Sequence, residues 1–311
     1  MVSAASHLSA GNLVAFPTET VYGLGADACN SAAVARIYEA KGRPADHPLI
    51  VHLASMDRMG DWASDVPEYA IALARDFWPG PMTLVMHRSE LAGDFITGGQ
   101  DTVGLRVPDH VVALALLEAF EGVGGNGIAA PSANRFGHVS PTTAGAVIEE
   151  LGDYLSADDI VLDGGACTVG VESTIIDCTG TQPKVFRPGA ISAEMIKEST
   201  GLEVVVTANE TSEEIRVSGS LENHYAPAAK VFLDLNPTAG QGYIADAKFA
   251  TPAGVIRLAS PRTDAEFAQL LYAALRSADA QGLAEVVVAQ PRGQGIALAI
   301  RDRLSRAANG R

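Results

Sequence analysis

Residues 16–25 read F-P-T-E-T-V-Y-G-L-G and directly follow an apolar run, Leu13–Phe16. Four consecutive apolar residues suit a strand that is buried on both faces of a sheet. The Pro-Thr-Glu-Thr that follows is typical of a turn, because proline and short polar side chains favour one. The segment therefore predicts a buried strand whose end delivers polar side chains into a loop.

The same arrangement recurs through the first two-thirds of the chain, where short apolar runs alternate with stretches of helical periodicity. This alternation predicts an α/β fold with a twisted, mixed, open sheet. Further strands are expected at Leu49–Leu53, Thr83–His87, Thr102–Val107, Gly127–Ala130, Ile160–Leu162, Thr174–Cys178 and Lys184–Phe186. Helices are expected at Ala32–Ala40, Glu68–Phe77, His110–Phe120, Thr142–Leu151 and Ser192–Ser199.

The character of the sequence changes after about residue 200, which indicates a second unit. Residues 201–229 are polar and acidic and end near His224-Tyr225-Ala226-Pro227, so we interpret them as a linker. Residues 230–311 then predict a small α/β domain, and residues 1–200 form the larger domain. The expected strands of the small domain are Lys230–Leu235, Gly254–Leu258 and Glu285–Ala289, and its expected helices are Ala265–Ala278 and Gln294–Ser305.

Composition and charge exclude several classes of protein. The 311 residues are 47% hydrophobic and 19% charged, which suits a packed core and not a disordered chain. Residues 1–227 hold 12 Lys/Arg against 30 Asp/Glu, a net charge of −18, whereas residues 228–311 carry +3. Tight, nonspecific binding to nucleic acid is therefore not expected. No apolar run approaches the roughly 18 residues that span a membrane.

The three cysteines are widely spaced and odd in number, which argues against a disulfide framework or a zinc site. Residues 1–11 lack the basic and apolar regions of a signal peptide. Together these features indicate a reducing compartment and a cytoplasmic location.

Most of the unusual polar residues of the larger domain lie in short loops rich in Gly and Pro. Of the twelve cations in residues 1–227, Lys41, Arg43, Arg106 and Arg187 are found there. Arginine suits bidentate binding of carboxylate or phosphate, and lysine suits a point-charge contact. Short hydroxyl and amide side chains accompany them at Thr18, Thr102, Ser132, Asn134, Ser140 and Ser173. The set predicts a site for a small molecule that carries a carboxylate and several phosphates.

Other chemistries lack their motifs. The chain has no G-x-x-x-x-G-K-[ST] and no G-x-S-x-G, and its histidines show no metal-ligand spacing. Catalysis by positioning and electrostatics remains, as in nucleotidyl transfer. Several of these residues also have a purely structural interpretation. Trp78-Pro79-Gly80-Pro81 could be a packing turn, and Tyr22 could belong to the core. Glu19 and Glu172 could be solvated or could cap backbone amides.

Taken together and in order, the loops resemble those of the threonylcarbamoyl-AMP synthases, the YrdC-like family, in its longer two-domain form. The resemblance rests on F-P-T-E-T-V-Y-G-L-G, on K-x-R at Lys41 and Arg43, on S-x-N at Ser132 and Asn134, and on V-E-S-T and R-P-G. It implies a mixed sheet with a concave cavity and a small Rossmann-like C-terminal domain.

The resemblance also implies a reaction. L-threonine would capture bicarbonate or CO2, and the resulting carboxylate would attack the α-phosphate of ATP, giving threonylcarbamoyl-AMP and pyrophosphate. A downstream tRNA threonylcarbamoyltransferase would use the product to modify tRNA. Mg2+ is expected with ATP, and its protein ligands are unknown. Two alternatives stay open: an RNA-binding module without catalysis, and a carbamoyl or adenylyl transferase for another amino acid.

By the resemblance, two groups of residues make up the site. Those expected to hold threonine are Thr18, His52, Arg106, Ala130 and Ser173. Those expected to hold ATP are Lys41, Arg43, His47, Thr102, Ser132, Asn134, Ser140, Arg187 and Tyr225. Lys41, Arg43 and Arg187 are the expected catalytic residues, because they would neutralise charge on the phosphates. His47 departs from the family, whose members commonly carry Asn there. Tyr225 would make the linker a lid, although His52 and Tyr225 could instead be packing residues.

Overall fold

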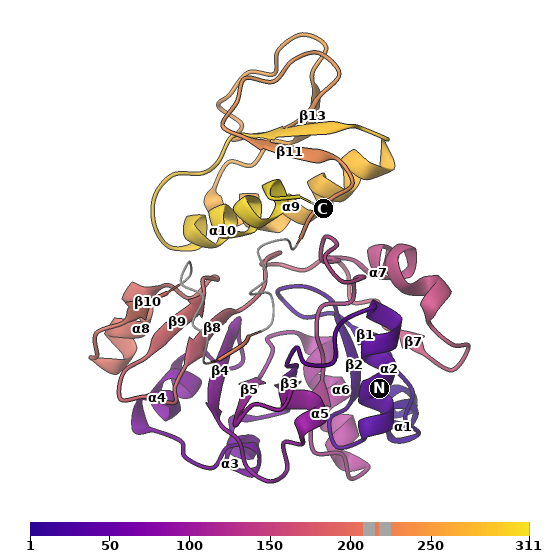
Figure 1. The fold of residues 1–311 in the computed structure, drawn as a ribbon, viewed down its shortest axis with the longest axis vertical. Helices are drawn as coiled ribbons and strands as arrows, with labels where there is room; N and C mark the ends of the chain where they lie inside the picture. Colours follow the sequence, from indigo (N-terminus) through magenta and orange to yellow (C-terminus); the bar gives the residue numbers. More distant parts are fainter. Residues whose placement is uncertain (208–214, 218–224, 311) are drawn as a thin grey trace.

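The computed structural model describes residues 1–207, 215–217 and 225–310. It shows a larger N-terminal unit built on one sheet and a smaller C-terminal unit built on another (Figure 1). No helix in the described ranges is long and apolar enough to span a membrane. His224 and most of residues 208–224 lie outside the described residues.

The larger unit contains a mixed sheet of ten strands in the order β10-β9-β8-β4-β5-β3-β6-β2-β1-β7. Neighbouring strands pair in both directions, as β3 with β5 in parallel and β4 with β5 antiparallel. The strands are β1 Val14–Phe16, β2 Gly23–Asp27, β3 Ile50–His52, β4 Met82–His87, β5 Thr102–Arg106, β6 Ile128–Ala129, β7 Ile160–Val161, β8 Thr174–Asp177, β9 Lys184–Arg187 and β10 Val205–Val206.

Helices cover this sheet. They are α1 Val2–Ser9, α2 Ser31–Lys41, α3 Met59–Trp62, α4 Glu68–Phe77, α5 Asp94–Thr97, α6 Val111–Gly122, α7 Ala144–Leu151 and α8 Ala193–Thr200, with short 3₁₀ turns at Met56–Arg58 and Gly152–Tyr154. Helix α2 shows why such segments begin and end where they do. The side chain of Asn30 accepts from the amides of Ala32 and Ala33, and Gly42 ends the helix at φ 62°.

The smaller unit is a parallel sheet of four strands in the order β11-β14-β12-β13. Its elements are β11 Lys230–Leu233, β12 Gly242–Ile244, β13 Ile256–Ala259, α9 Asp264–Ala280, β14 Glu285–Val288 and α10 Ile296–Ala308. Helices α9 and α10 lie on the side that faces the larger unit (Figure 1). The predicted α/β architecture of both units is therefore confirmed.

The two units share an apolar cluster. Val21, Val139 and Val171 of the larger unit pack with residues of α9 and α10, among them Leu271 and Ile300. This contact matters for the site, because all three valines lie in loops that the sequence analysis associated with ligand binding.

Six short elements were not expected from the sequence: α1, α3, α5, β2, β10 and β12. Strand β2 contains Gly23 and Gly25, which read as turn residues. Gly25 is required there because a Cβ would lie 2.7 Å from Ile128 Cγ2 and 2.8 Å from Phe16 Cε1. Strand β10 pairs with β9 and lies within residues 201–229, so part of the segment interpreted as a linker belongs to the large sheet.

Candidate active site

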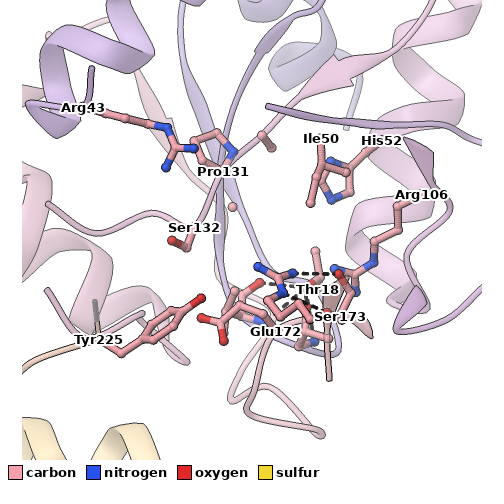
Figure 2. Close-up of a pocket in the computed structure, with 15 residues that line it drawn as sticks. Thr18, Arg43, Ile50, His52, Arg106, Pro131, Ser132, Glu172, Ser173 and Tyr225 are labelled. Atoms are coloured by element: carbon pink, nitrogen blue, oxygen red, sulfur yellow. Dashed lines mark hydrogen bonds between the residues drawn. The ribbon is translucent and has the colours of Figure 1, made fainter. Parts of the chain in front are cut away.

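A partly open pocket with a cavity volume of about 50 Å³ lies between the loop after β1, the ends of β3, β5 and β9, the loop after β6 and the segment before β8. Figure 2 shows its labelled side chains arranged around an open centre, with Arg43, His52 and Arg106 among them. The lining residues are Thr18, Thr20, Val21, Gly23, Arg43, Ile50, His52, Arg106, Ala130, Pro131, Ser132, Glu172, Ser173, Arg187 and Tyr225.

One side of the pocket is built on the register of two strands. His52 of β3 is the direct partner of Arg106 of β5, so both side chains reach the same region. Arg106 Nη2 donates to Glu19 Oε1 at 2.6 Å, and both side chains are only 5% exposed. Arg106 Nε donates to the carbonyl of Gly80 at 3.3 Å. These bonds fix the guanidinium, and since Nη1 makes no bond to any residue that the structure describes, it can serve as a donor.

His52 is a neutral imidazole. Burial, reinforced by the charge of Arg106, lowers the pKa of His52 to about 3. Its Nδ1 is buried and has no hydrogen-bond partner among the described residues. Because an unpaired buried polar atom is costly, this nitrogen is a natural contact for a ligand in the pocket.

Thr18 organises its own turn. Its hydroxyl donates to the carbonyl of Val21 at 2.7 Å and accepts from the amides of Thr20 and Val21, both at 3.2 Å. The P-T-E-T segment is therefore a hydroxyl-stabilised turn that faces the pocket.

Ser173 and Arg187 form another wall. Arg187 donates through Nε to the carbonyl of Ser173 and through Nη2 to its hydroxyl, both at 3.1 Å. The Ser173 hydroxyl also lies 2.8 Å from that of Thr83. The guanidinium is buried, and burial lowers the pKa of Arg187.

Glu172 lines the pocket but offers its oxygens to protein donors. Ser140 donates to Oε1 at 2.6 Å, whereas Tyr272 of α9 and Arg303 of α10 donate to Oε2, each at 2.8 Å. Burial alone would raise the pKa of Glu172, but the charges of Arg303 and Arg187 outweigh it and hold the pKa at about 2. The group is therefore a carboxylate at neutral pH.

Arg43 lies at the pocket, whereas Lys41 lies behind it. Arg43 lines the pocket, and burial lowers its pKa to about 10, so it stays charged at neutral pH. Lys41 is not among the lining residues. Its ammonium donates to the carbonyl of Ser132 at 2.6 Å and to that of Asn134. In the structure described here Lys41 thus holds the loop that carries Ser132.

Nine of the predicted site residues line one pocket: Thr18, Arg43, His52, Arg106, Ala130, Ser132, Ser173, Arg187 and Tyr225. Four others, besides Lys41, do not. His47 packs edge-on against Phe136, and Thr102 lines a neighbouring cavity beside Val217. Asn134 donates to the carbonyls of Arg135 and His138, and Ser140 is bonded to Glu172. Their predicted roles in ATP binding stay predictions.

Sequence reasoning did not assign Glu172, Tyr272 or Arg303 to the site. Glu172 could have been suspected, because it precedes Ser173 in V-E-S-T. Arg303 also carried a signal: with Ile300, Leu304 and Ala307 it falls at helical spacing on the apolar face of α10, where a charged residue needs a partner.

The pocket does not provide a magnesium site from protein groups alone. The described residues contain no group of three or more His, Cys, Asp or Glu that could hold a metal ion. Glu172, the acidic residue among the lining residues, already accepts three hydrogen bonds.

Comparisons with known proteins identify the family of both units. Residues 6–189 match the Sua5/YciO/YrdC family model, described as telomere recombination. Residues 191–309 match the model of the threonylcarbamoyl-AMP synthase C-terminal domain. The threonylcarbamoyl-AMP synthase of Pyrococcus abyssi is 41% identical over 98% of this chain and 92% of its own length. That of Bacillus subtilis is 38% identical over 100% of this chain and 93% of its own length.

Solved structures give the same result. The crystal structure of P. abyssi Sua5 complexed with L-threonine matches with a TM-score of 0.89 at 39% identity, covering 99% of this chain and 94% of that one. E. coli YciO, at 22% identity and a TM-score of 0.51, shares the fold over 60% of this chain. Fold and pocket thus define a two-domain α/β protein with a YrdC-like domain and a pocket lined by buried arginines. The chain belongs to the threonylcarbamoyl-AMP synthase family, in the form that carries the Sua5 C-terminal domain.

Proposed function

We propose that this protein synthesises threonylcarbamoyl-AMP and pyrophosphate from L-threonine, bicarbonate or CO2, and ATP. The observation that carries the proposal is the charge of the pocket. Three buried arginines line it, Arg43, Arg106 and Arg187, whereas its carboxylate Glu172 is fully engaged by protein donors. In a unit with net charge −18, such a pocket is suited to anionic ligands.

Threonine would lie against the adjacent ends of β3 and β5, at His52 and Arg106. Arg106 would bind its carboxylate through the donor that Glu19 and Gly80 leave available. The uncharged His52 can bond the hydroxyl or the amine without repelling an ammonium group. Ser173 and the backbone of Ala130 line the same pocket. The match to a Sua5 structure that contains L-threonine supports this assignment.

ATP would occupy the side lined by Arg43, Ser132, Arg187 and Tyr225. The neutral amine of threonine attacks carbon dioxide and gives up a proton to solvent, which forms a carbamate. A carbamate oxygen then attacks the α-phosphorus, and the bond to the bridging oxygen breaks, so that pyrophosphate leaves. Arg43 and Arg187 would stabilise the charge that develops on the phosphates. No nucleophilic side chain is required.

Mg2+ remains part of the proposal as an ion that enters with ATP. Magnesium commonly binds substrate phosphates and water with few protein ligands. Its contribution would be to neutralise the phosphate oxygens. The product would pass to a tRNA threonylcarbamoyltransferase, and we infer a cytoplasmic location, to which three free cysteines are suited.

The proposal is tested by measuring pyrophosphate release with ATP, bicarbonate and threonine, and with each substrate omitted. We expect release to depend on all three, with AMP rather than ADP as the nucleotide formed on breakdown. Serine lacks only the methyl group, so a preference for threonine of about 10- to 200-fold is expected. Equal rates with serine or glycine would favour another acceptor, and salt-dependent tRNA binding without pyrophosphate release would favour an RNA-binding module.

A further inference from the structure

Helices α9 and α10 of the C-terminal unit reach the wall of the pocket in the larger unit. Tyr272 and Arg303 both donate to Glu172 Oε2 at 2.8 Å. Gly170, two residues before Glu172, packs directly on α9, because a Cβ there would lie 2.4 Å from Gln269 Cα. Val171, between them, belongs to the apolar cluster shared with both helices. Three consecutive residues of this loop are therefore held by the C-terminal unit.

Arg303 touches more than Glu172. Its side chain is fully buried, and Nη2 donates to the carbonyl of Pro188 at 3.1 Å, next to Arg187. Its guanidinium carbon lies 5.3 Å from the ring centroid of Tyr225. Tyr225 also stacks on Tyr272, with ring centroids 5.8 Å apart. One arginine thus contacts two lining residues, Glu172 and Tyr225, and Pro188, the neighbour of the lining residue Arg187.

The residue that follows Glu172 is Ser173, whose hydroxyl lines the pocket and bonds to Arg187. Glu172 and Ser173 are consecutive residues directly before β8, so we expect a displacement of Glu172 to shift the backbone of Ser173 as well. Loss of the negative charge of Glu172 also removes an electrostatic attraction on the guanidinium of Arg187.

We propose that Arg303, assisted by Tyr272, is a positioning residue for the synthesis of threonylcarbamoyl-AMP: through Glu172 it places Ser173 and Arg187 in the pocket. This inference rests on the proposed function. It assigns to the C-terminal unit a direct part in shaping the site.

Stability alone does not account for this cluster. A buried ion pair gains little, since desolvation offsets the attraction, and replacing it by apolar residues is often neutral or stabilising. The cluster instead fixes a position: Tyr272 of α9 and Arg303 of α10 can both donate to Glu172 Oε2 only when that oxygen lies at one place. Glu172 lines the pocket, so the residue that is fixed in this way belongs to the site.

The charged state of Glu172 provides a readout that is specific to positioning. The groups that face it are Arg303 and Tyr272 from the C-terminal helices, Ser140 and Arg187 from the larger unit, and Tyr225. Asp302, which pairs with both Arg303 and Arg306, completes the surroundings. Burial opposes the charge of Glu172, and Arg303 is the leading group that maintains it. Removing Arg303 must therefore raise the pKa of Glu172.

The experiment compares full-length Arg303→Met, Arg303→Lys and Tyr272→Phe with the wild type. The matched control is Arg301→Met, in the same helix, since within the described residues Arg301 bonds only to the carbonyls of Pro291 and Gly293 of its own unit. Pyrophosphate release is measured between pH 5.5 and 8.5, with kcat and KM for threonine and for ATP. Thermal unfolding is measured alongside, and all assays are run well below the melting temperature.

We expect Arg303→Met to lower kcat/KM for threonine by at least about tenfold, the scale of losing one charged hydrogen bond at a site. It should also introduce an acidic limb, with the rate falling as pH decreases and Glu172 becomes protonated. Arg303→Lys should recover part of the rate, and Tyr272→Phe should lose less than Arg303→Met. The double variant Arg303→Met/Glu172→Gln should lose the acidic limb, because it lacks the titrating carboxyl group. Arg301→Met should match the wild type.

The inference is overturned if folded Arg303→Met retains the wild-type kcat/KM and pH profile and only its melting temperature falls. If Arg303→Met does not fold, Tyr272→Phe decides: an unchanged kcat/KM for threonine would then reject the idea. Failure of the proposed function is distinguishable, because in that case the wild type itself releases no pyrophosphate.

Discussion

At the scale of single residues, the site is defined by charges that have been removed from water. Arg106, Arg187 and Glu172 are all more than nine-tenths buried. Each is held by specific partners, because an unpaired buried charge would cost several kcal/mol (about 3–5 kcal/mol when one partner of a buried pair is removed). The cations therefore have fixed directions before any ligand binds, which suits catalysis by electrostatic preorganisation.

Arg106→Ala should raise the KM for threonine by about 10- to 100-fold, since a hydrogen bond to a charged group contributes roughly 1.5–3 kcal/mol. ATP affinity should change little, because Arg43 and Arg187 are untouched. Substrate titrations of pyrophosphate release and ATP binding by calorimetry would check this. The double variant Arg106→Ala/Glu19→Gln controls for the carboxylate that the single change leaves unpaired. Equal losses for threonine and ATP would contradict the assignment of Arg106.

His52 should make the protein less stable in mild acid. The pKa of His52 in the folded protein, about 3, lies below the ordinary value of 6.5. The stability that the neutral His52 contributes is therefore fully present above pH 6.5 and is lost as pH falls toward 3. The free energy of unfolding then decreases by up to about 1.4 kcal/mol per pH unit. Urea unfolding of the wild type and of His52→Gln from pH 7.5 to 5 measures it. The difference in free energy of unfolding should shrink as pH falls, and parallel curves would show that His52 is not buried as a neutral group.

At the scale of elements, short strands end at the pocket and their loops carry the chemistry. Strand β3 has three residues and β6 has two, so each strand places only one or two side chains before the chain turns. The loops are held by contacts with distant elements. Arg276 of α9 donates to the carbonyl of Val139 at 2.6 Å and pairs with Glu150 at 3.2 Å. Helix α9 therefore supports the loop after β6 as well as the Gly170–Ser173 loop.

Gly170 and Gly165 allow the helix contact to be tested separately from backbone strain. Both have positive φ, 82° and 84°, but a Cβ at Gly165 meets nothing within 4 Å, whereas at Gly170 it meets α9. Gly165→Ala should cost about 1–2 kcal/mol for the left-handed conformation alone. Gly170→Ala should cost about 1–3 kcal/mol more and raise the KM for threonine. Urea unfolding and substrate titrations measure both. If both variants lose the same free energy of unfolding, α9 moves away from a Cβ at residue 170 without a measurable loss of stability.

At the scale of the whole molecule, the two units have opposite net charge. The acidic larger unit meets a C-terminal unit of net charge +3, and two arginines of the smaller unit, Arg276 and Arg303, pair with Glu150 and Glu172 across the interface. An apolar cluster that contains Val21, Val139 and Val171 completes the contact. The interface thus joins both units at the loops that form the pocket.

A chain cut after Gly201 should lose most of its activity. Truncation removes Tyr225, Tyr272 and Arg303 and exposes the three valines of the shared cluster to solvent. We expect a fall in kcat/KM of at least about 100-fold, beyond the effect of Arg303→Met alone. Pyrophosphate release by the truncated and full-length proteins, each checked for solubility and secondary structure, measures it. A soluble truncated protein with full activity would show that the larger unit is self-sufficient.

Much of the fold follows from the sequence because it depends on local periodicity. Helix α4 has the predicted bounds Glu68–Phe77, and β4, β5, β8 and β9 lie within a residue of the expected ends. Strand β2 escaped prediction because its glycines reflect close packing against Phe16 and Ile128, which no local pattern reveals. The two-domain architecture and the family were confirmed, since the loop motifs are specific in combination.

The sequence by itself determined which groups are available: arginines and short polar side chains in Gly- and Pro-rich loops, with no nucleophile or metal motif. Only the tertiary structure decided which of them meet. Lys41 and Ser140 turn to protein partners, whereas Glu172 becomes a wall of the pocket held by a residue 131 positions further along the chain. The physical reason is that residue chemistry and helical spacing are local properties, but burial and charge pairing depend on which surfaces come together when two domains pack.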